Sequence, residues 1–236
     1  IQRLTGTASG NAEISVLAGI DANVRTNGQM ISEKTTAKVT ESGVDYSFLV
    51  GKHYGYTADL SSSALFFADG RSVNAAPYSE DGIYAQKAVL GKCKTFSVEK
   101  TCRVYTSRDD KKMPQAAETP DYEKEYALHL KAYKKLFDAI DVKIEGDDKN
   151  DQALRFANYH TLISAEQNDS VHSLSAKSLS GEKYNQFVWW DCEIYQMPVF
   201  THTMPQVAKN ALEYRYRMLP AARELAKKQG MKKGAR

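Results

Sequence analysis

The first hundred or so residues of the chain alternate between apolar and polar side chains in short runs. In residues 13–24, Ile14 and Val16 begin a series in which every second side chain is apolar. Residues 35–60 and 94–110 follow a similar rhythm and are rich in Thr, Val, Tyr and Phe. Because successive side chains of a strand point to opposite faces, this pattern, with turn residues between the runs, predicts an antiparallel β region.

From residue 119 the apolar side chains recur at spacings of four and three instead of two. They form one helix face, made of Tyr126, Leu130, Tyr133, Phe137 and Ile140. Thr119 can cap such a helix, and Pro120 suits its first position. We therefore expect a helix over 119–140 that packs on a core.

Two further helical segments follow. A helix over about 148–166 carries apolar residues around much of its circumference, which predicts burial on more than one side; they are Leu154, Phe156, Ala157, Tyr159 and Ile163. A third helix is expected from Pro205 to about Met218. Pro220 is then expected to interrupt it, and a short basic helix should end near Gly230, which suits a C-cap.

The strands come first and the helices second. This order predicts an α+β chain, with a β domain joined to an α domain rather than alternating βαβ units. The expected helices are too few to enclose a core by themselves, so we expect the chain to be a piece of something larger. The apolar runs, such as residues 64–68, are too short to cross a bilayer. The first residues do not have the charged and apolar regions of a secretory signal, although a first residue of Ile leaves a processed start open. We expect a cytoplasmic location without membrane contact.

Charge and cysteine content argue against several classes of function. The net charge is +3, and the basic side chains gather at the end of the chain, in residues 223–236, instead of on a defined face; this argues against nucleic-acid binding. Cys93, Cys102 and Cys192 show no CxxC spacing. Neither a disulfide framework nor a zinc site is indicated, and a reducing compartment is expected.

The five histidines lack the spacing of metal ligands; they are His53, His129, His160, His172 and His202. The sequence also lacks HExxH, GxSxG and a phosphate-binding loop. We therefore expect each histidine to be structural or at the surface, and we expect neither a metal nor a cofactor.

Residues 187–200, FVWWDCEIYQMPVF, place the two tryptophans of the chain, Trp189 and Trp190, beside Asp191 and Glu193. On a helix, residues two apart point in well-separated directions, so the two carboxylates would not form an acid/base pair. On a strand they would share a face about 7 Å apart, within the range of inverting glycosidases. A proline later in the segment favours the start of a helix.

A tryptophan beside an aspartate can hold a polyol. The indole offers a flat apolar face to the C–H face of a sugar, and the carboxylate accepts hydrogen bonds from neighbouring hydroxyls. The alternative is a tryptophan in the core with Asp191 capping a helix. Composition alone favours this alternative.

Five segments of the chain resemble glycoside hydrolase family 65. Residues 178–200, SLSGEKYNQFVWWDCEIYQMPVF, resemble the family's signature around a Phe-Trp-Asp-x-Glu core. Residues 211–236 resemble its Tyr-Arg-Tyr segment, and residues 144–156 the start of its catalytic domain. Residues 17–28 and 98–110 resemble strands of its N-terminal sandwich. The resemblance extends in order over the whole chain.

The resemblance implies three parts. Residues 1–118 would be the latter part of an antiparallel β-sandwich, and residues 119–145 a helical linker. Residues 146–236 would begin an (α/α)₆ catalytic barrel. Complete members of the family are expected to be homodimers.

The resemblance also implies an activity. Most members are inverting phosphorylases of α-linked glucosyl disaccharides or oligosaccharides, in which inorganic phosphate attacks the anomeric carbon and a Glu protonates the leaving oxygen, giving β-glucose 1-phosphate. Trp190 and Asp191 match the pair that binds the glucosyl unit. Trp189 stands where the family usually has Phe, and Glu193 matches a position with a structural role. The catalytic acid is expected beyond Arg236, so no residue of this chain is assigned to it.

The chain departs from the family pattern just before the tryptophans. Tyr184, Asn185, Gln186 and Phe187 stand where the family commonly has Tyr-Arg-Gly-His. The change removes a cation and an imidazole beside the sugar site, so the linkage and acceptor specificity stay open. A kojibiose- or trehalose-type hydrolase and a non-catalytic carbohydrate-binding segment are the alternatives to a phosphorylase.

Overall fold

The computed structural model describes most of the chain, namely residues 1–10, 13–26, 29–30, 32–50, 55–108, 120–165, 167–175 and 187–232. The chain divides into two compact units, Ile1–His129 and Leu130–Arg236. The first is the β unit and the second the helical unit.

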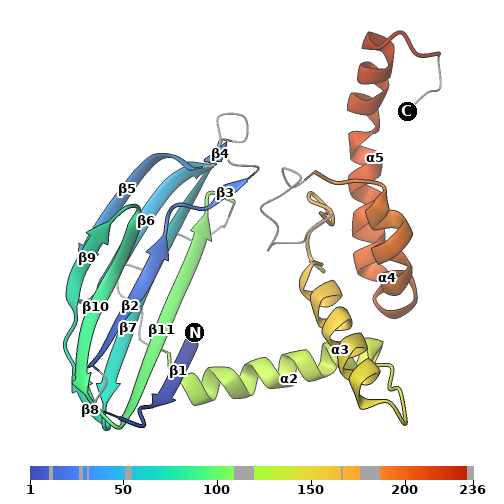
Figure 1. Cartoon of the computed structure of the whole chain (residues 1–236). Helices are drawn as coiled ribbons and strands as arrows, with labels where there is room; N and C mark the ends of the chain where they lie inside the picture. The colour runs from blue at the N-terminus through green and yellow to red at the C-terminus, as the bar shows by residue number, and fades with distance from the viewer. Residues whose placement is uncertain are drawn as a thin grey trace. The chain divides into compact units, whose positions relative to one another are not determined.

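The β unit is built from antiparallel strands in two main sheets (Figure 1). The larger sheet has the order β1-β11-β7-β6-β5, with β8 paired to β7, and the smaller has the order β2-β10-β9. A short ribbon pairs β3 with β4. The strands are β1 Gln2–Thr7, β2 Glu13–Asp21, β3 Arg25–Thr26, β4 Gln29–Met30, β5 Ser32–Thr40, β6 Gly43–Val50, β7 Tyr56–Ala68, β8 Arg71–Val73, β9 Ala76–Glu80, β10 Ile83–Lys92 and β11 Thr95–Thr106. The predicted antiparallel β region is confirmed.

The core of the β unit lies between the two main sheets. Phe66 of β7 and Val98 of β11 come from the larger sheet, and Ala88 and Leu90 of β10 come from the smaller one. These side chains form one buried cluster, against which Val16 of β2 also packs. The alternation in the sequence therefore marks the strand faces that meet in this core.

Helix α2 (Tyr122–Ile140) contains the boundary between the two units. The prediction that Thr119 caps this helix and that Pro120 is its first residue is wrong for Pro120, which precedes the helix; Thr119 lies outside the described residues. Asp121 takes the capping position instead, since its Oδ1 accepts a hydrogen bond from Lys124 N at 2.8 Å. An aspartate caps at least as well as a threonine. The apolar face of α2 is buried only at its end, at Ile140.

The helical unit continues with α3 (Asp148–Ile163), α4 (Met197–Thr203) and α5 (Pro205–Lys228). The side chain of Asp147 caps α3 by accepting a hydrogen bond from Asn150 N at 3.1 Å. The predicted burial of α3 on more than one side is not observed. Leu162 is its buried residue, whereas Phe156 is 66% exposed, because the described elements leave most of the helix without a partner.

Helix α5 runs for 24 residues without a break at Pro220, so the predicted interruption is wrong. A proline costs one backbone hydrogen bond in a helix. Here it lies at an exposed position between residues with good helix propensity. The prediction that the helix ends near Gly230 is confirmed, although Gln229 is the C-cap and Gly230 is the residue that follows it. Gly230 has φ +70°, and Met231 N donates to Ala226 O at 3.0 Å, which closes the end of the helix.

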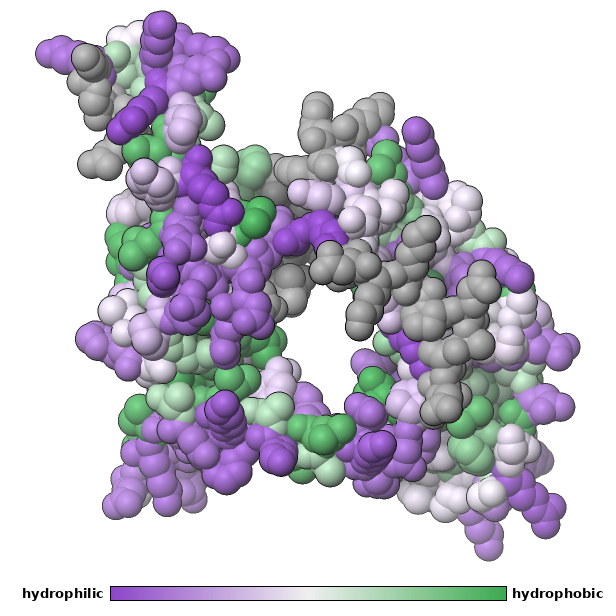
Figure 2. All heavy atoms as spheres, turned by 180° about the vertical axis from the view of Figure 1, so that it is seen from behind, coloured by the Kyte–Doolittle hydropathy of each residue, from purple (hydrophilic) through white to green (hydrophobic). Residues whose placement is uncertain are grey.

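A small core holds α4 and α5 together. It is a buried cluster of Leu174, Cys192, Phe200, Val207 and Ala208. Outside this cluster, apolar surface (green) interrupts the hydrophilic surface (purple) of the helical unit (Figure 2). The exposed apolar side chains of α3 and α5 include Phe156, Tyr159, Leu212, Tyr216 and Leu225. None of the helices described is both long and apolar enough to cross a membrane.

Candidate functional site

The segment around the two tryptophans begins a helix, as its sequence predicts. Asp191 is the first helical residue, Cys192–Gln196 form a π-helical turn, and α4 follows. Met197 N donates to Cys192 O, which is the hydrogen bond that defines the wider turn. Pro198, the proline noted in the sequence, lies in the first turn of α4, directly after the π-helical turn. Turns of this kind occur mostly as single insertions in helices, frequently at functional sites.

Cys192 fixes the orientation of this segment. Its side chain is 2% exposed, and its Sγ donates to Leu174 O at 2.9 Å. Burial raises the pKa of the Cys192 thiol, so the group stays protonated at neutral pH. Because the side chain of Cys192 points into the small core, the side chains of its neighbours Asp191 and Glu193 point in other directions.

Trp190 and Asp191 face away from the core. Trp190 is 68% exposed, and Asp191 is exposed as well. Asp191 occupies the N-cap position of the π-helical turn, but its side chain makes no capping hydrogen bond. The interpretation that composition favours, a core tryptophan with a capping aspartate, is therefore wrong. Both side chains are available to a ligand.

Glu193 has the opposite environment. Its carboxylate forms a two-point ion pair with Arg215 of α5, with Nε to Oε1 at 2.6 Å and Nη2 to Oε2 at 3.0 Å. The side chains are 22% and 37% exposed, so the pair is half-buried. The hydrogen bond to Glu193 raises the pKa of Arg215 above its ordinary value. Arg215 also donates from Nη1 to Val188 O at 3.5 Å.

Asp191 and Glu193 therefore do not act as a pair. One carboxylate is exposed and makes no cap, and the other is held by a guanidinium. This agrees with the expectation that residues two apart on a helix point in different directions. Sequence reasoning missed Arg215 as the partner of Glu193. The signal was present in the Tyr-Arg-Tyr motif of residues 214–216, but nothing in the sequence connects it with Glu193.

Other aromatic side chains surround this segment at the surface. Phe187, Trp189 and Tyr195 are all exposed, and Tyr195 was not singled out from the sequence. Residues 176–186 lie outside the described residues, and with them Asn185 and Gln186, at which the chain departs from the family pattern.

Two of the described histidines have partners other than the tryptophans. His172 Nδ1 lies 2.9 Å from Asp169 Oδ2, and His160 packs against the rings of Phe156 and Tyr159. Within the described ranges, no group of three or more His, Cys, Asp or Glu residues is placed to hold a metal ion.

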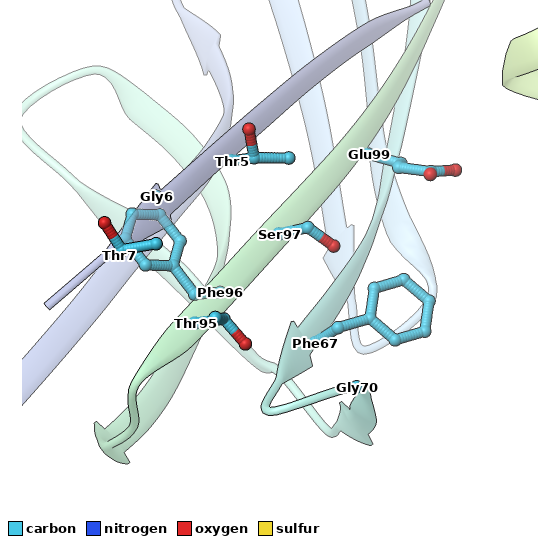
Figure 3. Close-up of a pocket in the computed structure, with 9 residues that line it drawn as sticks. All are labelled: Thr5, Gly6, Thr7, Phe67, Gly70, Thr95, Phe96, Ser97 and Glu99. Atoms are coloured by element: carbon cyan, nitrogen blue, oxygen red, sulfur yellow. The ribbon is translucent and has the colours of Figure 1, made fainter.

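A pocket of about 710 Å³ opens on the β unit (Figure 3). It is lined by residues of β1, β7 and β11 and the turn after β7, namely Thr5, Gly6, Thr7, Phe67, Gly70, Thr95, Phe96, Ser97 and Glu99. Glu99 is bound to Arg3, with Oε1 accepting from Nε at 2.8 Å. Trp190 and Asp191, the predicted site residues, belong to the other unit and do not line this pocket.

Comparisons with known proteins address the region of the tryptophans directly. Residues 155–236 match the model of the glycosyl hydrolase family 65 central catalytic domain. This range contains Trp190, Asp191 and the Glu193–Arg215 pair.

Similar proteins cover more of the chain. A 3-O-α-D-glucosyl-L-rhamnose phosphorylase from Lachnoclostridium phytofermentans is 41% identical over 229 residues, which is 94% of this chain and 30% of that protein. A kojibiose phosphorylase from Thermoanaerobacter brockii is 40% identical over 148 residues, which is 59% of this chain and 19% of that protein. The chain thus spans less than a third of the length of these relatives.

A solved structure from the human microbiome, named for kojibiose phosphorylase, resembles the fold. The TM-score is 0.58 at 17% identity, and the match covers 91% of this chain and 29% of that one. The order of sheets and helices is therefore shared with a structure of this kind. Taken together, the matched catalytic-domain region and these relatives show that the chain belongs to glycosyl hydrolase family 65.

Proposed function

We propose that the chain supplies the glucosyl-binding part of an inverting phosphorylase. The enzyme cleaves an α-glucosidic bond with inorganic phosphate and releases β-glucose 1-phosphate. The observation that carries the proposal is the outward-facing pair of Trp190 and Asp191, which lies inside the region matched to the catalytic domain. The relatives described above, which are named as phosphorylases of α-glucosyl compounds, support phosphorolysis as the reaction.

The chemistry of the pair suits a glucosyl unit. The indole of Trp190 offers a flat apolar face to the C–H face of the pyranose ring. The Asp191 carboxylate accepts hydrogen bonds from two neighbouring hydroxyls, and an ionised acceptor makes about twice as strong a bond as a neutral one. Because Asp191 makes no capping bond, it loses no interaction of this kind when a sugar binds.

Phosphate then attacks the anomeric carbon while a general acid protonates the departing oxygen. No residue of this chain is proposed for that acid. Residues 1–118 form the latter part of the sandwich, 119–145 the linker, and 146–236 the first helices of an (α/α)₆ barrel. The complete enzyme works as a cytoplasmic homodimer and needs phosphate but no cofactor.

The test is an assay of a full-length family 65 protein that carries this sequence. It is incubated with 3-O-α-D-glucosyl-L-rhamnose or with kojibiose, with and without inorganic phosphate. Formation of β-glucose 1-phosphate that requires phosphate is the expected result. Release of free glucose at the same rate without phosphate would contradict the proposal and identify a hydrolase. Glucose binding without turnover of any α-glucoside would identify a binding segment.

A further inference from the structure

The segment that carries Trp190 and Asp191 is held by few bonds of its own. The backbone N–H groups of Glu193 and Ile194 both donate to Trp190 O, at 3.1 and 3.3 Å. Asp191 adds no capping bond, and the side chain of Trp190 is mostly exposed. The backbone here is widened into a π-helical turn, which is rarer than the α-helical form. Cys192 anchors the middle of the segment in the small core, so the position of Trp190 and Asp191 also depends on a group that holds the two ends of the segment.

Arg215 is that group, because it reaches the segment on both sides of the two residues. Its Nη1 donates to Val188 O, two positions before Trp190. Its Nε and Nη2 bind Glu193, two positions after Asp191. One rigid guanidinium on α5 thus joins the two ends of the stretch in which Trp190 and Asp191 lie.

The geometry requires an arginine. The guanidinium is planar and presents its N–H groups in a fixed fork, so it can bind both carboxylate oxygens of Glu193 and still donate to Val188 O. A lysine keeps the charge but offers a single point of attachment. The half-buried position reduces screening by solvent and keeps the contact specific.

We propose that Arg215 and Glu193 are positioning residues, which hold Trp190 and Asp191 in the geometry that binds the glucosyl unit. This inference rests on the proposed function of Trp190 and Asp191. It assigns no contact between Arg215 and the sugar. It predicts that a positive charge at position 215 is not enough to maintain sugar affinity, and that affinity depends on the fork geometry of the guanidinium.

The experiment compares Arg215→Lys with Arg223→Lys in a full-length family 65 protein that carries this sequence. Arg223 is an exposed residue of the same helix and controls for the substitution itself. The readouts are the Kd for D-glucose by calorimetry, the KM and kcat for the glucosyl donor, and the melting temperature. We expect the Kd and the KM of Arg215→Lys to rise about 10- to 100-fold, because a displacement of about 1 Å can cost that much. Arg223→Lys should match the wild type.

A merely structural role gives a different result. The melting temperature would fall, but the folded protein would bind glucose with unchanged Kd and KM, and this would overturn the inference. If Arg215→Lys fails to fold, Glu193→Asp decides, since it keeps the charge and withdraws the carboxylate by one methylene. An unchanged Kd in a folded Glu193→Asp variant would equally overturn the inference.

Asp191→Asn separates this inference from the proposed function. If Asp191→Asn weakens glucose binding and Arg215→Lys does not, the proposed function stands and the positioning role fails. If neither variant changes the Kd, Trp190 and Asp191 are not the sugar site, and both proposals fail.

Discussion

Asp191 and Glu193 lie two residues apart in one helical segment, but their surroundings differ. Asp191 is exposed beside the exposed indole of Trp190, and its side chain makes no capping bond. Glu193 is half-buried and bound at two points by Arg215. Between them, Cys192 points into the core. This turn of helix thus has an open side, which carries Trp190 and Asp191, and a closed side, which carries Glu193 bound to Arg215.

The difference shows how two carboxylates of the same charge can have separate roles. A carboxylate already held by a guanidinium has little remaining capacity to bind a ligand, and removing its partner leaves a half-buried charge unpaired. A carboxylate that makes no cap can accept hydrogen bonds from a ligand. We therefore propose that the open side, with Trp190 and Asp191, recognises the glucosyl unit and that the closed side, with Glu193, positions these two residues.

Cys192, between Asp191 and Glu193, should be strongly protected from solvent in the native protein. Cys192 is buried and its pKa is raised, whereas Cys102 is exposed. In the native protein Cys192 should react with a thiol reagent on the order of 10³-fold more slowly than Cys102, because reaction requires unfolding. Mass spectrometry of timed labelling measures this. Equal labelling rates of Cys192 and Cys102 at neutral pH would show that Cys192 is accessible in the native protein.

The next effect tests the open side. Trp190→Ala removes the apolar face proposed to stack on the sugar. Burying a large apolar side chain contributes about 1.5–3 kcal/mol, which corresponds to roughly 10- to 150-fold in kcat/KM. Steady-state kinetics with a glucosyl donor, with circular dichroism as the control for folding, measure the loss. Wild-type efficiency in a folded variant would exclude stacking on this residue.

A smaller effect is expected for the stability of the closed side. Arg215→Met leaves the Glu193 carboxylate without its partner. We expect the free energy of unfolding to fall by about 1–2 kcal/mol, less than for a fully buried pair because both side chains retain some exposure. Arg223→Met, at an exposed position of the same helix, should change it by less than about 0.5 kcal/mol. Denaturant titration measures both, and equal values would show that the ion pair contributes nothing.

The smallest effect is expected for the other tryptophan. Trp189→Phe introduces the residue usual at this position of the family and keeps an aromatic ring. The change in kcat/KM should stay within about 2-fold, which is below 0.5 kcal/mol. A loss as large as that of Trp190→Ala would assign sugar recognition to Trp189 instead.

The sequence predicts the elements better than their ends. The alternation in residues 13–24 becomes β2 over Glu13–Asp21, because the period of two is a direct consequence of strand geometry. The break expected at Pro220 does not occur, since the hydrogen bonds on either side are enough to continue α5. The cap expected at Thr119 lies outside the described residues. Asp121 serves in its place, because several polar residues in a row can each cap a helix.

The candidate site is predicted in part. The resemblance selects Trp190 and Asp191, and the structure shows both exposed, but their role in binding stays a prediction. Composition alone favours the wrong environment for Asp191, because capping is the commonest use of an aspartate at a helix start. The Glu193–Arg215 pair could not be predicted, since the residues are 22 apart and meet only after α5 packs on this segment.

In the proposed site, Asp191 recognises the glucosyl unit and Glu193 does not. The most direct measurement compares kcat/KM of Asp191→Asn and Glu193→Gln for a glucosyl donor in the full-length protein. Asn keeps the shape of Asp191 but loses the charge-assisted acceptor, which contributes about 1.5–3 kcal/mol, or roughly 10- to 150-fold. Gln at position 193 keeps only one of the two oxygens that bind Arg215, so it should disturb the positions of Trp190 and Asp191 less than Arg215→Lys does, with a loss of up to about 10-fold, at the lower end of the range expected for Asp191→Asn. If Asp191→Asn keeps wild-type efficiency while Glu193→Gln loses it, the assignment of the two carboxylates is wrong.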